Sequence, residues 1–227
     1  NLVGDFGGGG MMLAFGMVCG LLEAQRSGLG QVVDTSMVEG SAALMAMFYG
    51  LRAQGFFSDQ RGTHMLDTGA HFYDAYETSD GRYVSIGSIE TKFYQLLMQK
   101  AELDPEVFKR QLDAKRWPDQ KAQLAAVIRT KTRDEWCALM EGTDVCFAPV
   151  LSVAEAPQHP HNVARGSFVT VEGAVQHRPT PRFSRTASDT PTAARPPGTD
   201  TLAVLRDCGF TQPQLDELLA SGAIAQL

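Results

Sequence analysis

Residues 4–12 read GDFGGGGMM, so one carboxylate enters a run of four glycines that leads directly into an apolar stretch. Glycine lets a backbone pass close to a ligand, and the amide groups at a helix start favour anions. Asp5 is therefore a candidate functional carboxylate. The spacing alone supports a simple helix cap about equally well. Four consecutive glycines exceed what a cap requires, which favours the functional interpretation.

Composition places the chain among globular proteins. It has 227 residues, 44% of them hydrophobic and 20% charged, enough for one large or two small domains. The net charge of −6 and the lack of a basic run argue against a nucleic-acid partner. Four scattered cysteines without a CxxC pair indicate reduced thiols and a cytoplasmic protein. The apolar stretch 11–22 is interrupted by glycine and shorter than a bilayer needs, so we expect neither a membrane span nor a signal peptide.

The first 54 residues predict part of an α/β domain. We expect a buried helix over residues 11–25 that stops before Gly28, then a short strand over residues 31–34. Ser36 followed by Glu39 forms a capping box, which starts a helix that runs to about residue 54. The order helix, strand, helix is typical of the edge of an α/β sheet.

A different pattern begins after an irregular crossing segment at residues 55–69. Two alternating stretches, 72–78 and 82–88, flank Ser79-Asp80-Gly81 and predict a β-hairpin. Thr132 and Glu135 predict a second capping box. Residues 145–151 predict a buried strand. The helices expected in this region cover residues 92–101, 105–112, 119–130 and 133–140.

The end of the chain predicts a connector and two helices. Residues 173–197 are rich in Pro, Thr, Ser and Arg and predict an extended connector. Amphipathic helices are expected over residues 201–208 and 213–220, and we expect both to return to the first domain. The predicted organisation is a large-domain part (1–35), a linker helix and crossing segment (36–69), a small domain (70–166), a linker (167–178) and a return to the large domain (179–227).

Three further groups of residues could carry chemistry. Glu90 ends a predicted strand and starts a helix, where the helix dipole stabilises negative charge, although an ordinary first-turn charge is the commoner role. His159 and His161 have metal-ligand spacing but no acidic or cysteine partner, so a solvated loop is expected. A group of methionines in two successive helices either fills a core or offers an adaptable surface to an acyl chain. They are Met11, Met12, Met17, Met37, Met45 and Met47.

Taken in order, these motifs resemble the family III CoA-transferases, the CaiB/BaiF fold, and within that family the branch that racemises 2-methylacyl-CoA thioesters. The resemblance covers the whole chain. The matching stretches are residues 4–9, 28–37, 71–73, 79–82, 87–90, 147–150 and 197–201.

The resemblance implies an intertwined homodimer in which each subunit has a Rossmann-like large domain and a small α+β domain. The active site would lie between the large domain of one subunit and the small domain of the other. In the racemases, the aspartate at the position of Asp5 assists a histidine, and the glutamate at the position of Glu90 works from the opposite face. The implied substrate contacts are Gly7, Gly8, Ile89 and Met37. No cofactor and no metal are expected, because the CoA thioester is itself the substrate.

The chain departs from the family pattern at its start. Family members carry an N-terminal half with the CoA groove and the catalytic histidine, and no histidine precedes Asp5 here. We therefore expect this half to be missing, or supplied in trans. Three hypotheses remain: a racemase that works through an enolate, a CoA-transferase with Asp5 as nucleophile, and an inactive fragment. The sequence Gly87-Ser88-Ile89-Glu90 is not the glycine-rich loop of the transferases, which favours the racemase.

Overall fold

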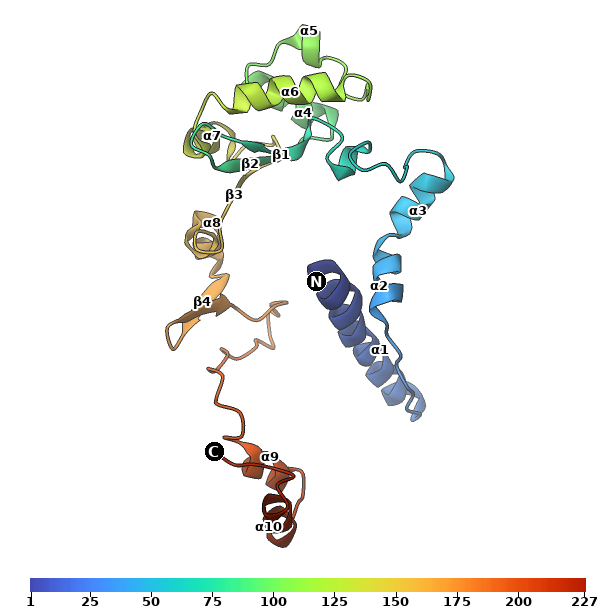
Figure 1. Ribbon diagram of the computed structural model, residues 1–227, viewed down its shortest axis with the longest axis vertical. Helices are drawn as coiled ribbons and strands as arrows, with labels where there is room; N and C mark the ends of the chain where they lie inside the picture. The colour runs from blue at the N-terminus through green and yellow to red at the C-terminus, as the bar shows by residue number, and fades with distance from the viewer. The chain divides into compact units, whose positions relative to one another are not determined.

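The computed structural model describes all 227 residues, which form two compact units, Asn1–Val150 and Leu151–Leu227 (Figure 1). The first unit opens with a π-helix, η1 (Leu2–Met11), which continues into α1 (Met12–Ser27). Gly28 ends α1 in the left-handed conformation, with φ at 76°. The predicted helix and its stop are confirmed. The expected burial is wrong, because no residue of α1 is buried.

The glycines of residues 7–10 are helical, so η1 and α1 together form a helix of 26 residues, Leu2–Ser27. An 18-residue window within it has a mean hydropathy of 1.4, so the helix is long and apolar enough to cross a membrane by length and composition. This corrects the expectation that the apolar stretch is too short. One such helix is weak evidence for a span, because core helices of soluble proteins and signal sequences meet the same criteria. The cytoplasmic location stays a prediction.

The strand expected at residues 31–34 does not form. Val33 lies instead against two glycines of α1: a Cβ atom added to Gly16 would be 2.8 Å from Val33 Cγ1, and one added to Gly20 would be 3.3 Å from Cγ2. An extended segment becomes a strand only when a neighbouring strand pairs with its backbone groups. The Rossmann-like part of the predicted fold therefore stays a prediction.

Ser36 begins α2 (Met37–Leu44), as predicted. Its Oγ accepts a hydrogen bond from the Glu39 amide at 3.2 Å and donates one to the Glu39 carboxylate at 2.9 Å. The expected single helix is two helices, because the backbone leaves the helical range at Met45 and resumes in α3 (Ala46–Ala53). The crossing segment 55–69 is irregular apart from a single turn, η2 (Met65–Asp67).

The predicted hairpin is confirmed, as the first two strands of a three-stranded antiparallel sheet with the order β1-β2-β3. The strands are β1 (Tyr73–Glu77), β2 (Tyr83–Gly87) and β3 (Phe147–Val150). Strand β3 alternates between half-buried and exposed side chains, so the expectation that it is fully buried is wrong. Strand β3 pairs only with β2, and one of its faces stays open to solvent.

Helices pack on this sheet and complete a core (Figure 1). They are α4 (Thr91–Lys100), α5 (Pro105–Phe108), α6 (Trp117–Ile128) and α7 (Arg133–Met140). Helix α5 ends four residues before the predicted end, which leaves residues 109–116 outside any helix. The capping box of Thr132 and Glu135 is confirmed. The core includes Phe72, Tyr76, Val84, Ile86, Tyr94, Leu97, Leu124, Ile128, Trp136 and Met140.

The second unit contains a hairpin that the sequence analysis missed. Strands β4 (Phe168–Val171) and β5 (Ala174–His177) pair antiparallel, so the predicted connector is wrong over residues 174–177. Glu172 and Gly173 both have positive φ, which suits a tight two-residue hairpin turn. The terminal helices are confirmed as α9 (Thr201–Asp207) and α10 (Gln212–Ala220). The unit also holds η3 (Ala156–Gln158) and α8 (Pro160–Arg165). The predicted domain boundaries, and the return of α9 and α10 to the large domain, stay predictions.

Candidate active site

Asp5 lies inside η1 rather than at its cap, which is Asn1. The Asp5 carboxylate is 60% exposed, and its nearest charge is the α-amino group of Asn1, with 4.0 Å between nitrogen and Oδ2. No hydrogen bond of the structure ends on this carboxylate. The alternative that Asp5 only caps a helix is therefore not supported by the geometry.

The glycine run has a packing reason that needs no ligand. Gly8 is buried against α2, where a Cβ atom added to it would lie 2.7 Å from the Ser41 amide nitrogen. A Cβ atom added to Gly40 would lie 1.8 Å from the Gly8 carbonyl oxygen. The two glycines therefore let the backbones of η1 and α2 touch. The substrate-binding roles of Gly7 and Gly8 stay predictions.

The methionines of this region do not fill a core. A shallow pocket of about 410 Å³ lies on α2 and the start of α3. Met37 lines it and is 53% exposed, and a Cβ atom added to Gly9 would be 3.0 Å from Met37 Cγ. Methionine adapts well to irregular apolar partners, so this surface fits the second of the two interpretations. The pocket is lined by Met37, Val38, Ser41, Ala42, Met45 and Tyr49.

Glu90 is the N-cap residue of α4, with φ at −71° and ψ at 140°. It is exposed, and its carboxylate forms no hydrogen bond or ion pair in the structure, while its carbonyl oxygen accepts from the amides of Phe93 and Tyr94. Ile89 beside it is half-buried and packs against the core. Glu90 is thus an unpaired carboxylate at the start of a helix.

Sequence reasoning missed a thiol near Glu90. Cys146 is exposed, in the left-handed conformation with φ at 58°, and its carbonyl oxygen accepts a hydrogen bond from the Gly87 amide. Burial of its sulfur, together with the nearby Glu90 carboxylate, raises the pKa of the Cys146 thiol. Cys146 and Tyr73 also line a pocket of about 440 Å³ on the sheet. No sequence signal placed Cys146 beside Glu90, because the two residues meet only through the pairing of β2 with β3.

The predicted site residues form two groups. Asp5, Gly7, Gly8 and Met37 lie on η1 and α2, which pack together. Ile89 and Glu90 lie together at the start of α4. No hydrogen bond or ion pair joins the two groups within the chain, and their meeting across a dimer stays a prediction.

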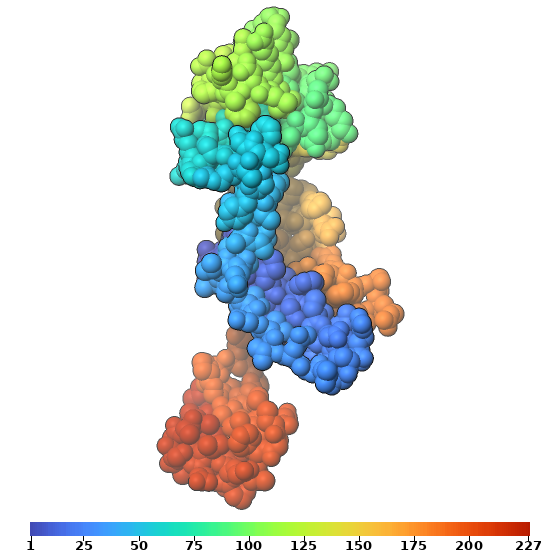
Figure 2. Space-filling view, turned by 90° about the vertical axis from the view of Figure 1, so that its right-hand side faces the viewer, coloured from blue at the N-terminus to red at the C-terminus, as the bar shows by residue number.

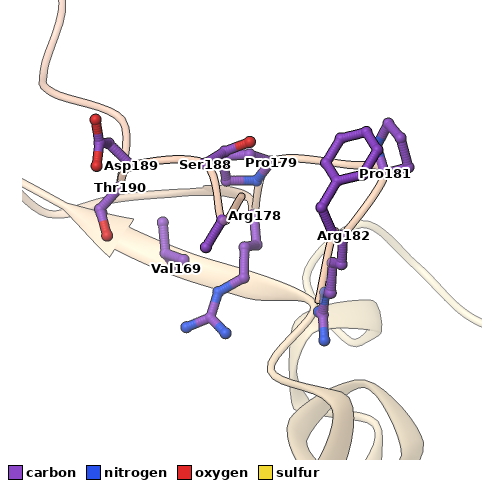
Figure 3. Close-up of a pocket in the computed structure, with 10 residues that line it drawn as sticks. Val169, Arg178, Pro179, Pro181, Arg182, Ser188, Asp189 and Thr190 are labelled. Carbon is purple, nitrogen blue, oxygen red and sulfur yellow. The ribbon is translucent and has the colours of Figure 1, made fainter. Parts of the chain in front are cut away.

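A separate pocket of about 320 Å³ lies in the second unit and holds none of these residues. Figure 3 shows the guanidinium groups of Arg178 and Arg182 on the same side of this segment. Arg182 donates hydrogen bonds to the carbonyl oxygens of Arg165 and Gly166, at 2.5 and 2.9 Å. A cation at these last carbonyls of α8 stabilises the helix end, which explains Arg182 without a ligand.

No group of three or more His, Cys, Asp or Glu side chains in the structure could hold a metal ion. His159 and His161, the pair with metal-ligand spacing, lie at the N-cap and within α8. The absence of a metal or cofactor from the reaction stays a prediction.

Comparisons with known proteins agree on one family. The chain is 43% identical over 221 residues to mouse alpha-methylacyl-CoA racemase and 39% identical to the human protein, over 96% of this chain and 58% of each racemase. A crystal structure of a CaiB/BaiF family protein from Brucella suis matches the fold with a TM-score of 0.66 at 20% identity, over 88% of this chain and 54% of that one. The chain thus spans little more than half the length of these relatives. The sequence profile of CoA-transferase family III matches residues 1–201, and the chain therefore belongs to that family.

Proposed function

We propose that this chain contributes to an enzyme that inverts the 2-methyl stereocentre of acyl-CoA thioesters by 1,1-proton transfer through an enolate. The observation that carries the proposal is the identity of 39–43% to two racemases over nearly the whole chain. Two carboxylates that accept no hydrogen bond, Asp5 and Glu90, lie on separate elements and support it.

The chemistry needs two proton-transfer groups on opposite faces of the α-carbon. One removes the proton, and the other returns a proton from the opposite side. The enolate between these steps requires hydrogen-bond donors at the thioester oxygen, a role for which backbone amides are suited. In our proposal Glu90 serves one face, and Asp5 supports a histidine on the other. That histidine would come from polypeptide outside these 227 residues.

The methionine surface is the proposed acyl subsite. Met37 and Met45 offer flexible, polarisable side chains that can follow acyl groups of different shape. Since the CoA thioester is the substrate, the reaction as proposed uses no separate cofactor.

We propose an intertwined homodimer as the working form. Helix α1 has no buried residue, and exposed apolar surface of this extent marks a protein contact. In such a dimer Asp5 of one protomer would face Glu90 of its partner. The N-terminal half known from the family would cover the remaining apolar faces.

A CoA-transferase is the second candidate, since the family profile that matches the chain is that of the transferases. Asp5, exposed and free of hydrogen bonds, would attack the thioester carbonyl and form an acyl anhydride while CoA leaves as the thiolate. Only this candidate makes Asp5 indispensable and Glu90 dispensable.

Deuterium exchange at the α-carbon of 2-methylacyl-CoA tests the proposal. We expect little or no exchange from the chain alone, because the loss of one member of a cooperating catalytic set removes most of the rate. Asp5→Asn and Glu90→Gln should both abolish what remains, whereas the exposed Glu23→Gln on α1 should leave it unchanged. Robust exchange by the chain that survives both substitutions would overturn the assignment. Acyl transfer to a carboxylic acid, lost in Asp5→Asn but kept in Glu90→Gln, would identify the transferase.

A further inference from the structure

Gln111 follows the short helix α5, and its side chain reaches back to the loop that precedes Glu90. Its amide nitrogen Nε2 donates to the carbonyl oxygen of Ser88 at 3.0 Å and to that of Ile89 at 2.8 Å. A side-chain amide has two N–H donors, so this one nitrogen can satisfy both carbonyls. These are the two carbonyl groups immediately before Glu90.

The position of Gln111 is itself fixed by the core. Its own carbonyl oxygen accepts a hydrogen bond from the indole Nε1 of Trp117 at 2.8 Å, and Trp117 is only 7% exposed. The backbone around Gln111 therefore has little freedom to follow the loop if the loop moves.

The loop is held on its other side by β3 and the residues before it. The buried Ser88 hydroxyl donates to the Val145 carbonyl oxygen, and the Gly87 amide donates to the Cys146 carbonyl oxygen at 2.9 Å. Ile89 closes a tight turn, with its amide donating to the Gly87 carbonyl oxygen at 2.9 Å. Only Gln111 holds the loop from the side of α5 and α6 with hydrogen bonds.

We propose that Gln111 is a positioning residue that holds the backbone from which the Glu90 side chain projects, through the two carbonyl groups before it. Glu90 has no hydrogen bond or ion pair on its carboxylate, so only its backbone fixes the place from which the side chain projects. The catalytic meaning of this role rests on the proposed function of Glu90 as a proton-transfer group. Proton transfer requires such a group to lie within hydrogen-bond reach of the α-carbon proton, which a loose loop would not maintain.

Two substitutions separate hydrogen bonding from space filling. Gln111→Met keeps the length and apolar stem of the side chain but removes both donors. Gln111→Glu keeps the shape but brings acceptor oxygens against two carbonyl oxygens. Gln123→Met is the matched control, because Gln123 lies exposed on α6 and donates to nothing in the structure.

Amide hydrogen exchange on the purified 227-residue chain is the test. The Ile89 and Phe93 amides are protected by hydrogen bonds within the loop and to Glu90. We expect their exchange to rise about tenfold in both Gln111 variants, because the loop can then open without breaking the two hydrogen bonds from Gln111. Their exchange should stay unchanged in Gln123→Met. The rise should be confined to residues 87–93. Unchanged exchange in Gln111→Met would overturn the inference, and so would an equal rise across α4, α6 and α7.

Turnover separates this inference from the proposed function. In any preparation that exchanges the α-proton, Gln111→Met should lower kcat about tenfold and leave KM within about twofold, because substrate contacts are kept while the proton-transfer geometry is lost. A Glu90→Gln variant with full turnover would overturn the proposed function and leave the exchange result of Gln111→Met intact. Full turnover of Gln111→Met beside a dead Glu90→Gln would overturn only the positioning role.

Discussion

The helical segment of residues 2–53 and the sheet domain of residues 70–150 are both rich in apolar side chains, but only the sheet domain buries them. In the helical segment the buried residues are two glycines, Gly8 and Gly40. Phe15, at 69% exposure, is typical of the other apolar residues of this segment, which Figure 2 draws in blue. The sheet domain closes a continuous core. A sequence can therefore specify an apolar helix without containing the partner that covers it.

The physical difference is the presence of a second layer. A helix hydrophobic on all sides needs packed neighbours around it. The continuous helix of η1 and α1 contacts α2 through Gly8 and contacts Val33 through Gly16 and Gly20. Three strands with helices on one face can bury a shared core within about 80 residues. We therefore expect the sheet domain to carry its own stability and the helical segment to depend on further protein.

The largest difference in stability between the two regions should come from substituting Trp136. Its side chain is fully buried and its indole donates to the Ile128 carbonyl oxygen at 2.7 Å. Trp136→Ala should lower the free energy of unfolding by about 3–5 kcal/mol, whereas Phe15→Ala on α1 should change it by less than about 0.5 kcal/mol. Urea denaturation followed by tryptophan fluorescence measures both, since Trp117 remains as a reporter in Trp136→Ala. Equal losses would mean that α1 shares the core of the sheet domain.

The buried His71 should make the sheet domain sensitive to acid. Tyr94 donates its only O–H proton to the Phe108 carbonyl oxygen, so it accepts from His71 Nε2, and Nδ1 is left without a partner. Burial lowers the pKa of His71 from 6.5 to about 4. Between these values the unfolded chain binds a proton that the folded chain does not. The contribution of neutral His71 to the free energy of unfolding is therefore fully present above pH 6.5 and falls by up to about 3 kcal/mol as the pH drops toward 4.

Urea midpoints at a series of pH values test this, with His71→Gln as the variant. We expect the slope between pH 6.5 and 4 to flatten in His71→Gln, because glutamine can still donate to Tyr94 but does not titrate. His161→Gln, at an exposed position on α8, is the control and should keep the slope. An unchanged slope in His71→Gln would assign the acid sensitivity to other groups.

A smaller effect should appear where the helical segment does pack. Gly40→Ala places a methyl group 1.8 Å from the Gly8 carbonyl oxygen, so η1 must move away from α2, at a cost of about 1–3 kcal/mol. Faster amide exchange over η1 would report the separation. Gly50→Ala on α3 is the control, because nothing lies within 4 Å of the added atom. Unchanged protection of η1 in Gly40→Ala would show that this contact is not what holds the two helices.

The smallest effect is expected from removing the N-cap hydroxyl groups of α7 and α2. Thr132→Ala removes the cap of α7 in the sheet domain and should lower its free energy of unfolding by about 1 kcal/mol. Ser36→Ala removes the equivalent cap of α2 and should leave the urea midpoint of the sheet domain unchanged, with only faster exchange at the start of α2. A matching midpoint shift in both variants would mean that the two regions unfold together.

The sequence by itself determined the local elements with clear signals. The capping residues Ser36 and Thr132, the stop at Gly28 and the turn at Ser79-Asp80-Gly81 act within a few residues, so spacing was enough to place them. The family resemblance also followed from short motifs along the chain, and the match to residues 1–201 confirms it.

Only the tertiary structure decided which of those elements contact one another. Residues 31–34 have strand composition but no neighbouring strand, so Val33 packs on Gly16 and Gly20 instead. Gln111 was expected inside a helix; because α5 stops at Phe108, its side chain is free to reach Ser88 and Ile89. Cys146 comes close to Glu90 through strand pairing across more than 50 residues of sequence. Such contacts depend on which surfaces meet, and local sequence patterns carry no record of a partner distant in the chain.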